Sequence, residues 1–166
     1  MSTRPIRQLK QWRTPVLDPD DPRLFQEQLL NYNADKDALA WYMACACTIM
    51  SKSNRVAAFP VMTRFFTCFT PLSCAIAPDC RPVYDDLLEI LRPSGMFNIK
   101  ATRIISLSSD WSDHRGYQQL AGASKYFQQS YEIFVLEKYP HLEDITDHHL
   151  KAYVCAHATG SSLSPV

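Results

Sequence analysis

The stretch DALAWYMACACTIM, residues 37–50, decides the fold class. Its apolar run, 38–50, has 13 residues, which is short of the roughly 20 that a helix needs to cross a bilayer. Side chains of this kind leave almost no polar face on a helix, and such a helix is buried on most sides. We therefore expect residues 37–50 to form a helix that runs through the middle of a domain.

The segments on both sides of this helix continue the same periodicity. Apolar residues recur at about 3.6-residue spacing along most of the chain, and no segment of useful length alternates with period two. The sequence therefore predicts an all-α fold, with Asn98 capping the helix 99–109 and Thr146 capping the last helix. Another helix is expected after Pro22, with Leu24, Phe25, Gln28 and Leu29 on one side. The remaining expected helices are one that carries Val56 to Phe66, a short one within 69–82, one over 83–91, one that carries Phe127 to Val135, and the last over 147–157.

Length and charge place these helices in one domain. The chain has 166 residues, of which 46% are apolar and 20% charged, and this is the size and composition of a single globular domain. Seventeen basic residues balance 17 acidic ones, so net charge by itself predicts no nucleic-acid partner. We divide the chain into a basic N-terminal arm (1–20), a single domain (21–158) and a tail (159–166).

The basic residues are not spread evenly within the domain. Residues 52–103 carry seven bases and four acids, so the middle of the chain is its basic part. Arg55 and Arg64 in this part are expected to be free for solvent or phosphate. The six cysteines have no C-x2-C pair and no histidine partners at metal-binding spacing, so we expect reduced thiols, no metal site and no cofactor.

The first informative motif is the turn at 120–124, Leu-Ala-Gly-Ala-Ser. A tight turn between two helices leaves backbone N–H groups unpaired, and such a nest attracts phosphate. Gly122 would let a DNA backbone approach closely, and Lys125 adds a positive charge. The alternative is a plain connection between two helices.

The second motif is Asp147, at the mouth of the last helix. The simple interpretation is an aspartate that complements the helix dipole, worth about 0.3–1 kcal/mol. The functional interpretation depends on the same helix dipole. The dipole at a helix N-terminus favours the ionised carboxylate, and this carboxylate can then face developing positive charge.

Together these motifs resemble the helix-hairpin-helix (HhH-GPD) DNA glycosylase superfamily, and within it the thymine glycosylase domain of methyl-CpG-binding domain proteins. The resemblance covers about residues 24–157. It rests on the order and spacing of LFQEQL (24–29), Trp41 followed by FPV (59–61), LRPSGMFNIKA (91–101), LAGASKY (120–126), SYEIF (130–134) and DHHLKAY (147–153). It implies a two-lobed helical fold in which the hairpin grips DNA phosphates and one nucleotide is flipped into the cleft between the lobes.

The resemblance also assigns residue roles. Asp147 corresponds to the catalytic aspartate, which stabilises the oxocarbenium-like sugar and helps to position water. Tyr126 corresponds to the pocket tyrosine, and we place it in both the catalytic and the base-binding sets. Gln26 corresponds to the base-reading glutamine, with Phe25 beside it in the base-binding set. Without the resemblance, Gln26 reads as a solvated helix residue and Tyr126 as a packed one.

Tyr126 also indicates the reaction type. Bifunctional relatives have a lysine at this position and cut the strand through a Schiff base, so a tyrosine implies simple hydrolysis to an abasic site. Lys125 lies about 100° further around the helix axis, and we expect it to face phosphate.

Two loops match the family's wedges, which fill the hole that a flipped base leaves. Lys52 and Met96 are the candidates to enter the duplex. The full DNA-binding set is Lys52, Ser53, Arg55, Met96, Gly122, Ser124, Lys125 and His149.

Four departures from the family pattern bear on DNA binding. Lys52 replaces an arginine and loses its planar stacking surface, and His149 stands where lysine is common. Ser124 replaces the second hairpin glycine, and Phe127 replaces a small residue. We expect the last two to distort the phosphate nest.

The sequence therefore predicts a monofunctional DNA glycosylase of base excision repair that removes uracil or thymine, opposite guanine, from double-stranded DNA. We expect a monomer without a membrane partner, located in the nucleus, with the mitochondrion as the alternative. One rival hypothesis is a catalytically degenerate DNA-binding protein, favoured by Ser124, Phe127 and the zero net charge. The other is a helical protein-interaction domain.

Overall fold

The computed structural model describes residues 15–30 and 36–158. All regular structure in these ranges is helical, which confirms the all-α prediction. The α-helices are α1 (Phe25–Leu30), α2 (Lys36–Met50), α3 (Arg55–Cys68), α4 (Pro71–Ile76), α5 (Arg81–Leu91), α6 (Phe97–Ser112), α7 (Lys125–Phe134) and α8 (His148–Ala158). Short 3₁₀ turns η1 (Ala77–Asp79), η2 (Arg92–Ser94), η3 (Tyr117–Gln119) and η4 (Leu142–Asp144) connect them.

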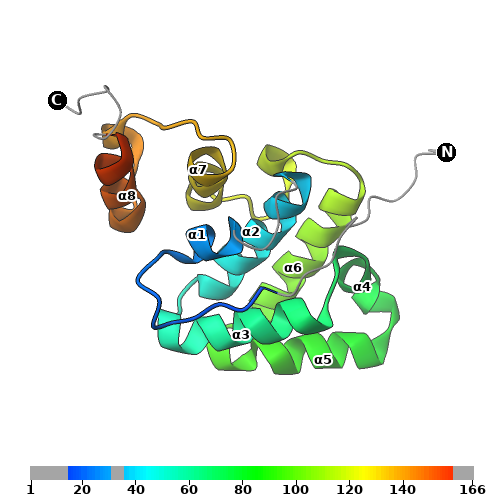
Figure 1. Ribbon diagram of the computed structural model, residues 1–166. Coiled ribbons are helices and arrows are strands. Elements are labelled where there is room, and N and C mark those ends of the chain that lie inside the picture. The colour runs from blue at the N-terminus through cyan, green and yellow to red at the C-terminus, as the bar shows by residue number, and fades with distance from the viewer. Residues whose placement is uncertain (1–14, 31–35, 159–166) are drawn as a thin grey trace.

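Helix α2 lies at the centre, as its sequence predicts. It packs against α1, α3, α6 and α7 (Figure 1), and most of its side chains are buried. The indole N–H of Trp41 donates a 2.9 Å hydrogen bond to the Ser108 hydroxyl on α6. A buried polar atom without a partner costs about 1–3 kcal/mol, so this bond lets the ring lie wholly inside the core.

The other helices lie on two sides of α2. Helices α3, α4, α5 and α6 pack against one another on one side, and α7 and α8 lie towards the opposite end of the molecule (Figure 1). Within the described residues, no single helix is both long and apolar enough to cross a membrane. Helix α3 and the segment Pro71–Asp79 meet that criterion only together, across an 89° bend.

Two of the predicted helix caps are wrong. Helix α6 begins at Phe97, and the residue before it is Met96 in a left-handed conformation, so Asn98 lies inside the first turn. Helix α8 is capped by Asp147 rather than Thr146, because the Asp147 Oδ2 atom accepts a 2.9 Å hydrogen bond from the Leu150 amide. Aspartate is as good an N-cap as serine and better than threonine.

The end of the predicted N-terminal arm is part of the folded domain. Leu17 is buried, and its amide donates to the Thr63 hydroxyl on α3 at 3.0 Å. The Asp18 amide donates to the Gln28 side-chain oxygen on α1 at 2.9 Å. Residues 15–20 are thus attached to α1 and α3. The rest of the predicted arm, 1–14, and the tail, 159–166, lie outside the described residues.

Candidate DNA-binding and catalytic site

A hydrogen bond joins two of the predicted site residues across the molecule. The Gln26 Nε2 atom on α1 donates to the Tyr126 hydroxyl on α7 at 2.9 Å and to the Ser130 hydroxyl, one turn further along α7, at 3.0 Å. The Gln26 side chain is 0% exposed, so its interpretation as a solvated residue is wrong. Its Oε1 atom is buried and has no hydrogen-bond partner among the described residues.

The third predicted residue, Asp147, is half-buried at the N-terminus of α8. Burial is the main cause that raises the pKa of Tyr126 and of Cys47, and the charge of Asp147 adds to it. Its backbone carbonyl accepts from the Lys151 amide at 3.0 Å, which continues the helix. The simple interpretation of Asp147 as a helix cap is therefore correct.

Burial keeps the groups around Asp147 neutral. Burial, assisted by Cys47, raises the pKa of Tyr126 well above its ordinary range, and the hydrogen bond from Gln26 opposes this. Burial likewise raises the pKa of Cys47, opposed by a hydrogen bond with Ser130 and assisted by Asp147. At neutral pH Tyr126 is therefore a phenol and Cys47 a thiol. A phenol can hold Gln26 in place and offer its own proton, but it is a poor nucleophile.

Phe25 supports this group from the apolar side. It is buried, and its ring meets those of Tyr126 and Phe59 edge to face, with centroids 6.4 Å and 6.5 Å away. Edge-to-face pairs of this kind are worth about 0.5–1.5 kcal/mol beyond their burial. Phe25 thus fixes the ring of Tyr126.

The hairpin of residues 120–124 adopts a tight turn. The Ala123 amide donates to the Leu120 carbonyl at 2.9 Å, and Gly122 has a φ of 72°, which only glycine adopts without strain. The Ala121 amide donates to the Asp110 carboxylate at 2.9 Å. The amides of Gly122 and Ser124 have no acceptor within the part of the chain that the structure describes, so the predicted nest has free donors.

The expected distortion by Ser124 does not occur. Its φ is −75°, an ordinary extended value, so this position does not require glycine. Its hydroxyl accepts from the Phe127 amide at 3.2 Å and caps α7. Phe127 points into the core and is buried. The turn is predicted to join two helices, but the segment before it is only the 3₁₀ turn η3, and α7 follows it.

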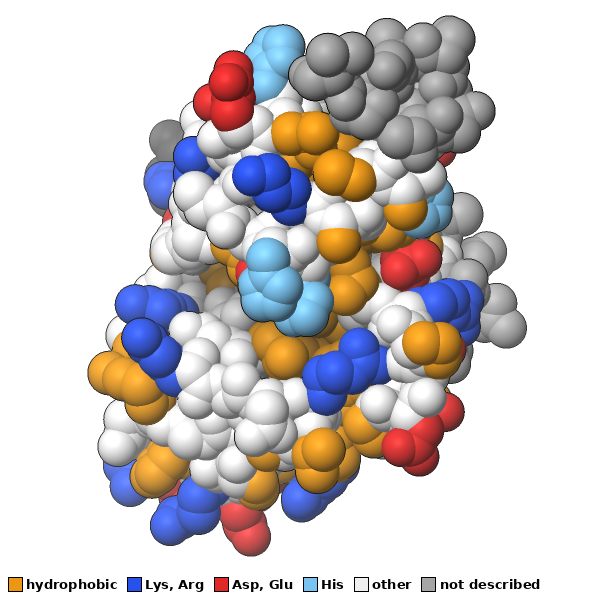
Figure 2. Space-filling model, turned by 90° about the vertical axis from the view of Figure 1, so that its left-hand side faces the viewer, with side chains coloured by type: hydrophobic (Ala, Val, Ile, Leu, Met, Phe, Trp, Pro, Cys, Tyr) orange, Lys and Arg blue, Asp and Glu red, His pale blue; other side chains and the backbone are white. Residues whose placement is uncertain are grey.

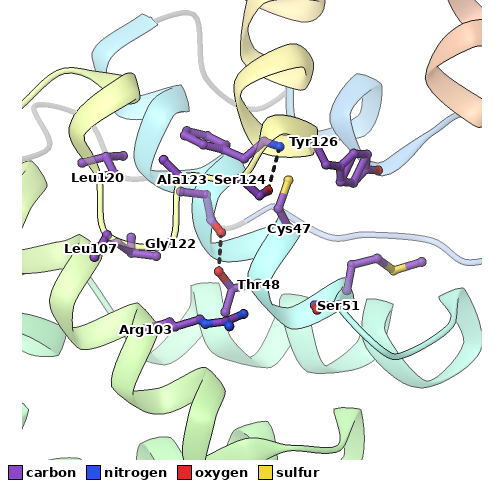
Figure 3. Close-up of a pocket in the computed structure, with 14 residues that line it drawn as sticks. Cys47, Thr48, Ser51, Arg103, Leu107, Leu120, Gly122, Ala123, Ser124 and Tyr126 are labelled. Atoms are coloured by element: carbon purple, nitrogen blue, oxygen red, sulfur yellow. Dashed lines mark hydrogen bonds between the residues drawn. The ribbon is translucent and has the colours of Figure 1, made fainter. Parts of the chain in front are cut away.

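A cavity of about 240 Å³ lies beside the hairpin. Figure 3 shows Thr48 and Arg103 on the side of the cavity near Gly122 and Ala123, and Ser51 further from the hairpin. The Thr48 hydroxyl donates to the Ala44 carbonyl at 2.9 Å. The Arg103 side chain on α6 is exposed, and its Cδ atom is 3.6 Å from the position that a Cβ atom on Gly122 would occupy. The cavity is therefore lined by a guanidinium and by hairpin residues with free amides, a combination that suits an anion.

The two predicted wedge residues share an unusual backbone conformation. Lys52, between α2 and α3, has a φ of 53°, and Met96, just before α6, has a φ of 48°. Both are non-glycine residues in the left-handed region, which is uncommon. Lys52 is exposed, Met96 is 51% exposed, and Ser53 is half-buried. Strained, exposed tips of this kind concentrate at functional sites.

The remaining predicted DNA-binding residues differ in whether their side chains are available to bind phosphate. Arg55 is not free, because its guanidinium donates to the backbone carbonyls of Asp21 and Arg23 and covers the Phe59 ring at 4.6 Å. Its expected availability for phosphate is therefore wrong. Lys125 and His149 are exposed, and His149 lies against the neighbouring His148, with ring centroids 4.0 Å apart.

Four residues near the site were missed at the level of sequence. They are Cys47, Lys100, Arg103 and Ser130. Only Ser130 had an available signal, since it is four residues after Tyr126 and so lies on the same helix face. The others are brought to the site by contacts between helices that are distant in the sequence.

The site as described consists of the buried Gln26 amide bonded to Tyr126, the capping carboxylate of Asp147 and the turn beside Arg103. No group of three or more His, Cys, Asp or Glu side chains that could hold a metal ion occurs in residues 15–30 and 36–158. No model of a known protein family matches the chain.

Proposed function

We propose that the protein is a helix-hairpin-helix DNA glycosylase that hydrolyses the N-glycosidic bond of uracil or thymine, mispaired with guanine, in double-stranded DNA. The observation that carries the proposal is the hydrogen bond between Gln26 and Tyr126, two residues that the resemblance assigns to one pocket. In this proposal α2 to α6 form one lobe, and α1, α7 and α8 contribute to the other. The flipped nucleotide enters between them, and excision begins base excision repair.

The free acceptor of Gln26 explains the choice of base. Its Nε2 atom already donates to Tyr126 and Ser130, so the Oε1 atom is the part of the amide left for a ligand. Uracil and thymine each present an imide N–H, which can donate to Oε1. Cytosine presents a bare ring nitrogen at the same position, which would leave two acceptors facing each other. A buried unpaired polar group costs about 1–3 kcal/mol, so cytosine is rejected.

Asp147 supplies the chemistry. Cleavage of an N-glycosidic bond places positive charge on the sugar in the transition state, and a fixed carboxylate next to the sugar stabilises that charge. The same carboxylate can orient the water that attacks C1′. The base leaves with the bonding electrons, and the imide edge held by Gln26 remains hydrogen-bonded as it departs.

The reaction stops at the abasic site. A lyase step needs an amine beside C1′ to form a Schiff base, and at the position where bifunctional relatives have a lysine this chain has Tyr126, whose pKa burial raises so that it stays a neutral phenol. Lys125 is exposed on the preceding position of α7, and we assign it to phosphate.

The surface around α8 suits a phosphate backbone. On the face shown in Figure 2, Lys and Arg side chains lie on both sides of histidines near the centre, and acidic side chains lie in the upper, right-hand and lower parts of the same face. Basic side chains gathered locally can attract DNA even when the net charge is zero. We propose a monomer that works in the nucleus, or alternatively in the mitochondrion.

One observation favours a second candidate, a DNA-binding protein that does not excise bases. The Gln26 amide is completely buried, so a flipped base reaches it only after neighbouring side chains move. We propose that helix α8 moves in this opening, against the buried contacts of Leu150 and Val154 and the contact of the Tyr153 ring with Phe134 at 4.4 Å that hold it. A protein in which this opening does not occur would bind DNA without cutting it.

The test is a panel of duplexes with one G·U, G·T, A·U or G·C pair, incubated with excess protein and then treated with alkali. We expect alkali-dependent strand breaks at G·U and G·T and none at G·C, and we expect Asp147→Asn to abolish them. Intact strands with stoichiometric protein, or equal activity in Asp147→Asn, would reject the proposal. A gel shift without breaks would support the second candidate.

A further inference from the structure

A buried lysine connects the two loops that carry Lys52 and Met96. The Lys100 Nζ atom on α6 lies 2.8 Å from the Ile49 carbonyl, 2.8 Å from the Ser94 carbonyl and 3.2 Å from the Ser94 hydroxyl. The side chain is 2% exposed. An ammonium group has three protons, so these three acceptors use all of them.

The two anchors are the bases of the two loops. Ile49 lies in the last turn of α2, three residues before Lys52, and Ser94 ends η2, two residues before Met96. The Ser94 hydroxyl also donates to the Leu91 carbonyl at 2.8 Å, which attaches the second loop to α5. One ammonium group thus holds both loops, although they are separated by more than 40 residues of sequence.

This arrangement is costly for stability alone. Every partner of Lys100 is a neutral oxygen, and burial lowers the pKa of Lys100 to about 8. An apolar side chain of similar volume can replace a buried charge with neutral or favourable effect on stability. A charged ammonium group fixes the positions of three acceptors on two separate loops, which an apolar side chain cannot do.

We propose that Lys100 is a positioning residue that makes the Lys52 and Met96 loops one rigid wedge, so that the two side chains enter the DNA duplex together. The inference rests on the proposed function, because it is that function which requires a flipped nucleotide and a filled gap. It adds that the two tips act as a unit rather than as independent contacts.

The first experiment measures the connection without DNA. Amide hydrogen exchange is compared in the wild type and Lys100→Met. Ser94→Ala is the milder variant, because it removes the hydroxyl contact with Lys100 and the bond to the Leu91 carbonyl but keeps both carbonyl contacts of Lys100. We expect both loops, 51–54 and 94–96, to exchange at least tenfold faster in Lys100→Met, and the hairpin 120–124 to be unchanged. Acceleration of one loop only, or of neither, would overturn the inference. If Lys100→Met does not fold, Ser94→Ala is used instead, and the informative result is faster exchange of loop 51–54, because the lost bond to Leu91 affects loop 94–96 directly. Unchanged exchange of loop 51–54 in that variant would overturn the inference.

The second experiment measures cooperation between the tips. Fluorescence of 2-aminopurine next to the G·U pair reports base flipping for Lys52→Ala, Met96→Ala and the double variant. In the wild-type background we expect the double variant to lose much less flipping than the product of the two single losses, by about tenfold. In Lys100→Met or Ser94→Ala this non-additivity should shrink, to within a factor of two for Lys100→Met.

The outcomes separate the inference from the proposed function. Multiplicative losses in the wild type would overturn the inference while leaving the glycosylase proposal intact. A wild type that gives no fluorescence change with any lesion duplex would count against the proposed function, and with it against a wedge role for Lys100. Faster hydrogen exchange in Lys100→Met would then show only that Lys100 holds the two loops together.

Discussion

Asp147 combines two roles that can be separated by one substitution. Its carboxylate caps α8 through the Leu150 amide and acts on Tyr126 through its charge. Asparagine is an equally good N-cap, so Asp147→Asn should leave the free energy of unfolding within about 0.5 kcal/mol of the wild type. The excision rate should fall by about 10²- to 10³-fold, the usual effect of removing one electrostatic stabiliser of a transition state. Urea unfolding checks the prediction on stability, and single-turnover kinetics check the prediction on the excision rate.

Tyr126 is expected to act through Gln26. Tyr126→Phe removes the hydroxyl that accepts from Gln26 at 2.9 Å but keeps the ring against Phe25. The Ser130 contact remains, so stability should fall by only about 1 kcal/mol. We expect roughly tenfold slower excision of uracil, because a 1.4 kcal/mol loss in orientation is a factor of ten in rate. An unchanged rate would mean that the hydroxyl does not orient the amide.

Lys100 should give the protein a measurable pH dependence of stability. Burial lowers the pKa of Lys100 to about 8, from 10.5. Between these values the unfolded chain binds more protons than the folded chain, so the contribution of Lys100 to stability rises with pH and is lowest below pH 8. Relative to Lys100→Met, the wild type should gain about 1–3 kcal/mol from pH 8 to pH 10.5. A difference in unfolding free energy that stays constant over this range would contradict the burial of a charged amine.

At the scale of elements, the hairpin and α6 act together. Arg103 lies on α6 beside Gly122 and lines the same cavity as the hairpin. Arg103→Gln should weaken DNA binding and reduce the slope of log affinity against log salt by about 0.9, the loss of one phosphate contact. Arg64→Gln is the matched control, because Arg64 is also exposed but lies on α3 beside a separate groove with Cys68 and Ile90. If the slope of log affinity against log salt is the same in both variants, Arg103 does not contact DNA phosphate.

The sequence could predict the elements better than their ends. Apolar periodicity locates the core helix α2, because the apolar residues within 37–50 are the ones that the helix buries. The start of α6 was placed too late because Met96 takes a left-handed conformation before the helix, which propensity disfavours for a non-glycine residue. The cap of α8 was assigned one residue early, since Thr146 and Asp147 are both acceptable caps.

The site was predictable only through the resemblance. Periodicity alone makes Gln26 a solvated residue, and only the packing of α1 against α7 shows it buried beside Tyr126. Arg103 and Cys47 carry no local signal, since their neighbours come from other helices. The freedom of Arg55 was misjudged for the same reason, because the carbonyls that bind it belong to a loop more than 30 residues earlier.

At the scale of the whole molecule, the proposal requires the residues on α1, α7 and α8 to face DNA held by the hairpin and the two tips. The structure joins Gln26 on α1 to Tyr126 on α7 by a hydrogen bond, and the proposal adds Asp147, at the start of α8, as the third residue that acts on the same nucleotide. Their effects should therefore be strongly non-additive, as is usual for groups that act on the same reacting atoms. Independent, additive losses would indicate that the three residues do not share a substrate.

The most direct measurement is the product formed from a G·U duplex, analysed by mass spectrometry for free base and for the strand. The glycosylase proposal predicts one equivalent of free uracil and an uncut strand with an abasic site from the wild type, and neither from Asp147→Asn. An intact uracil-containing strand after prolonged incubation with excess wild-type protein would contradict it.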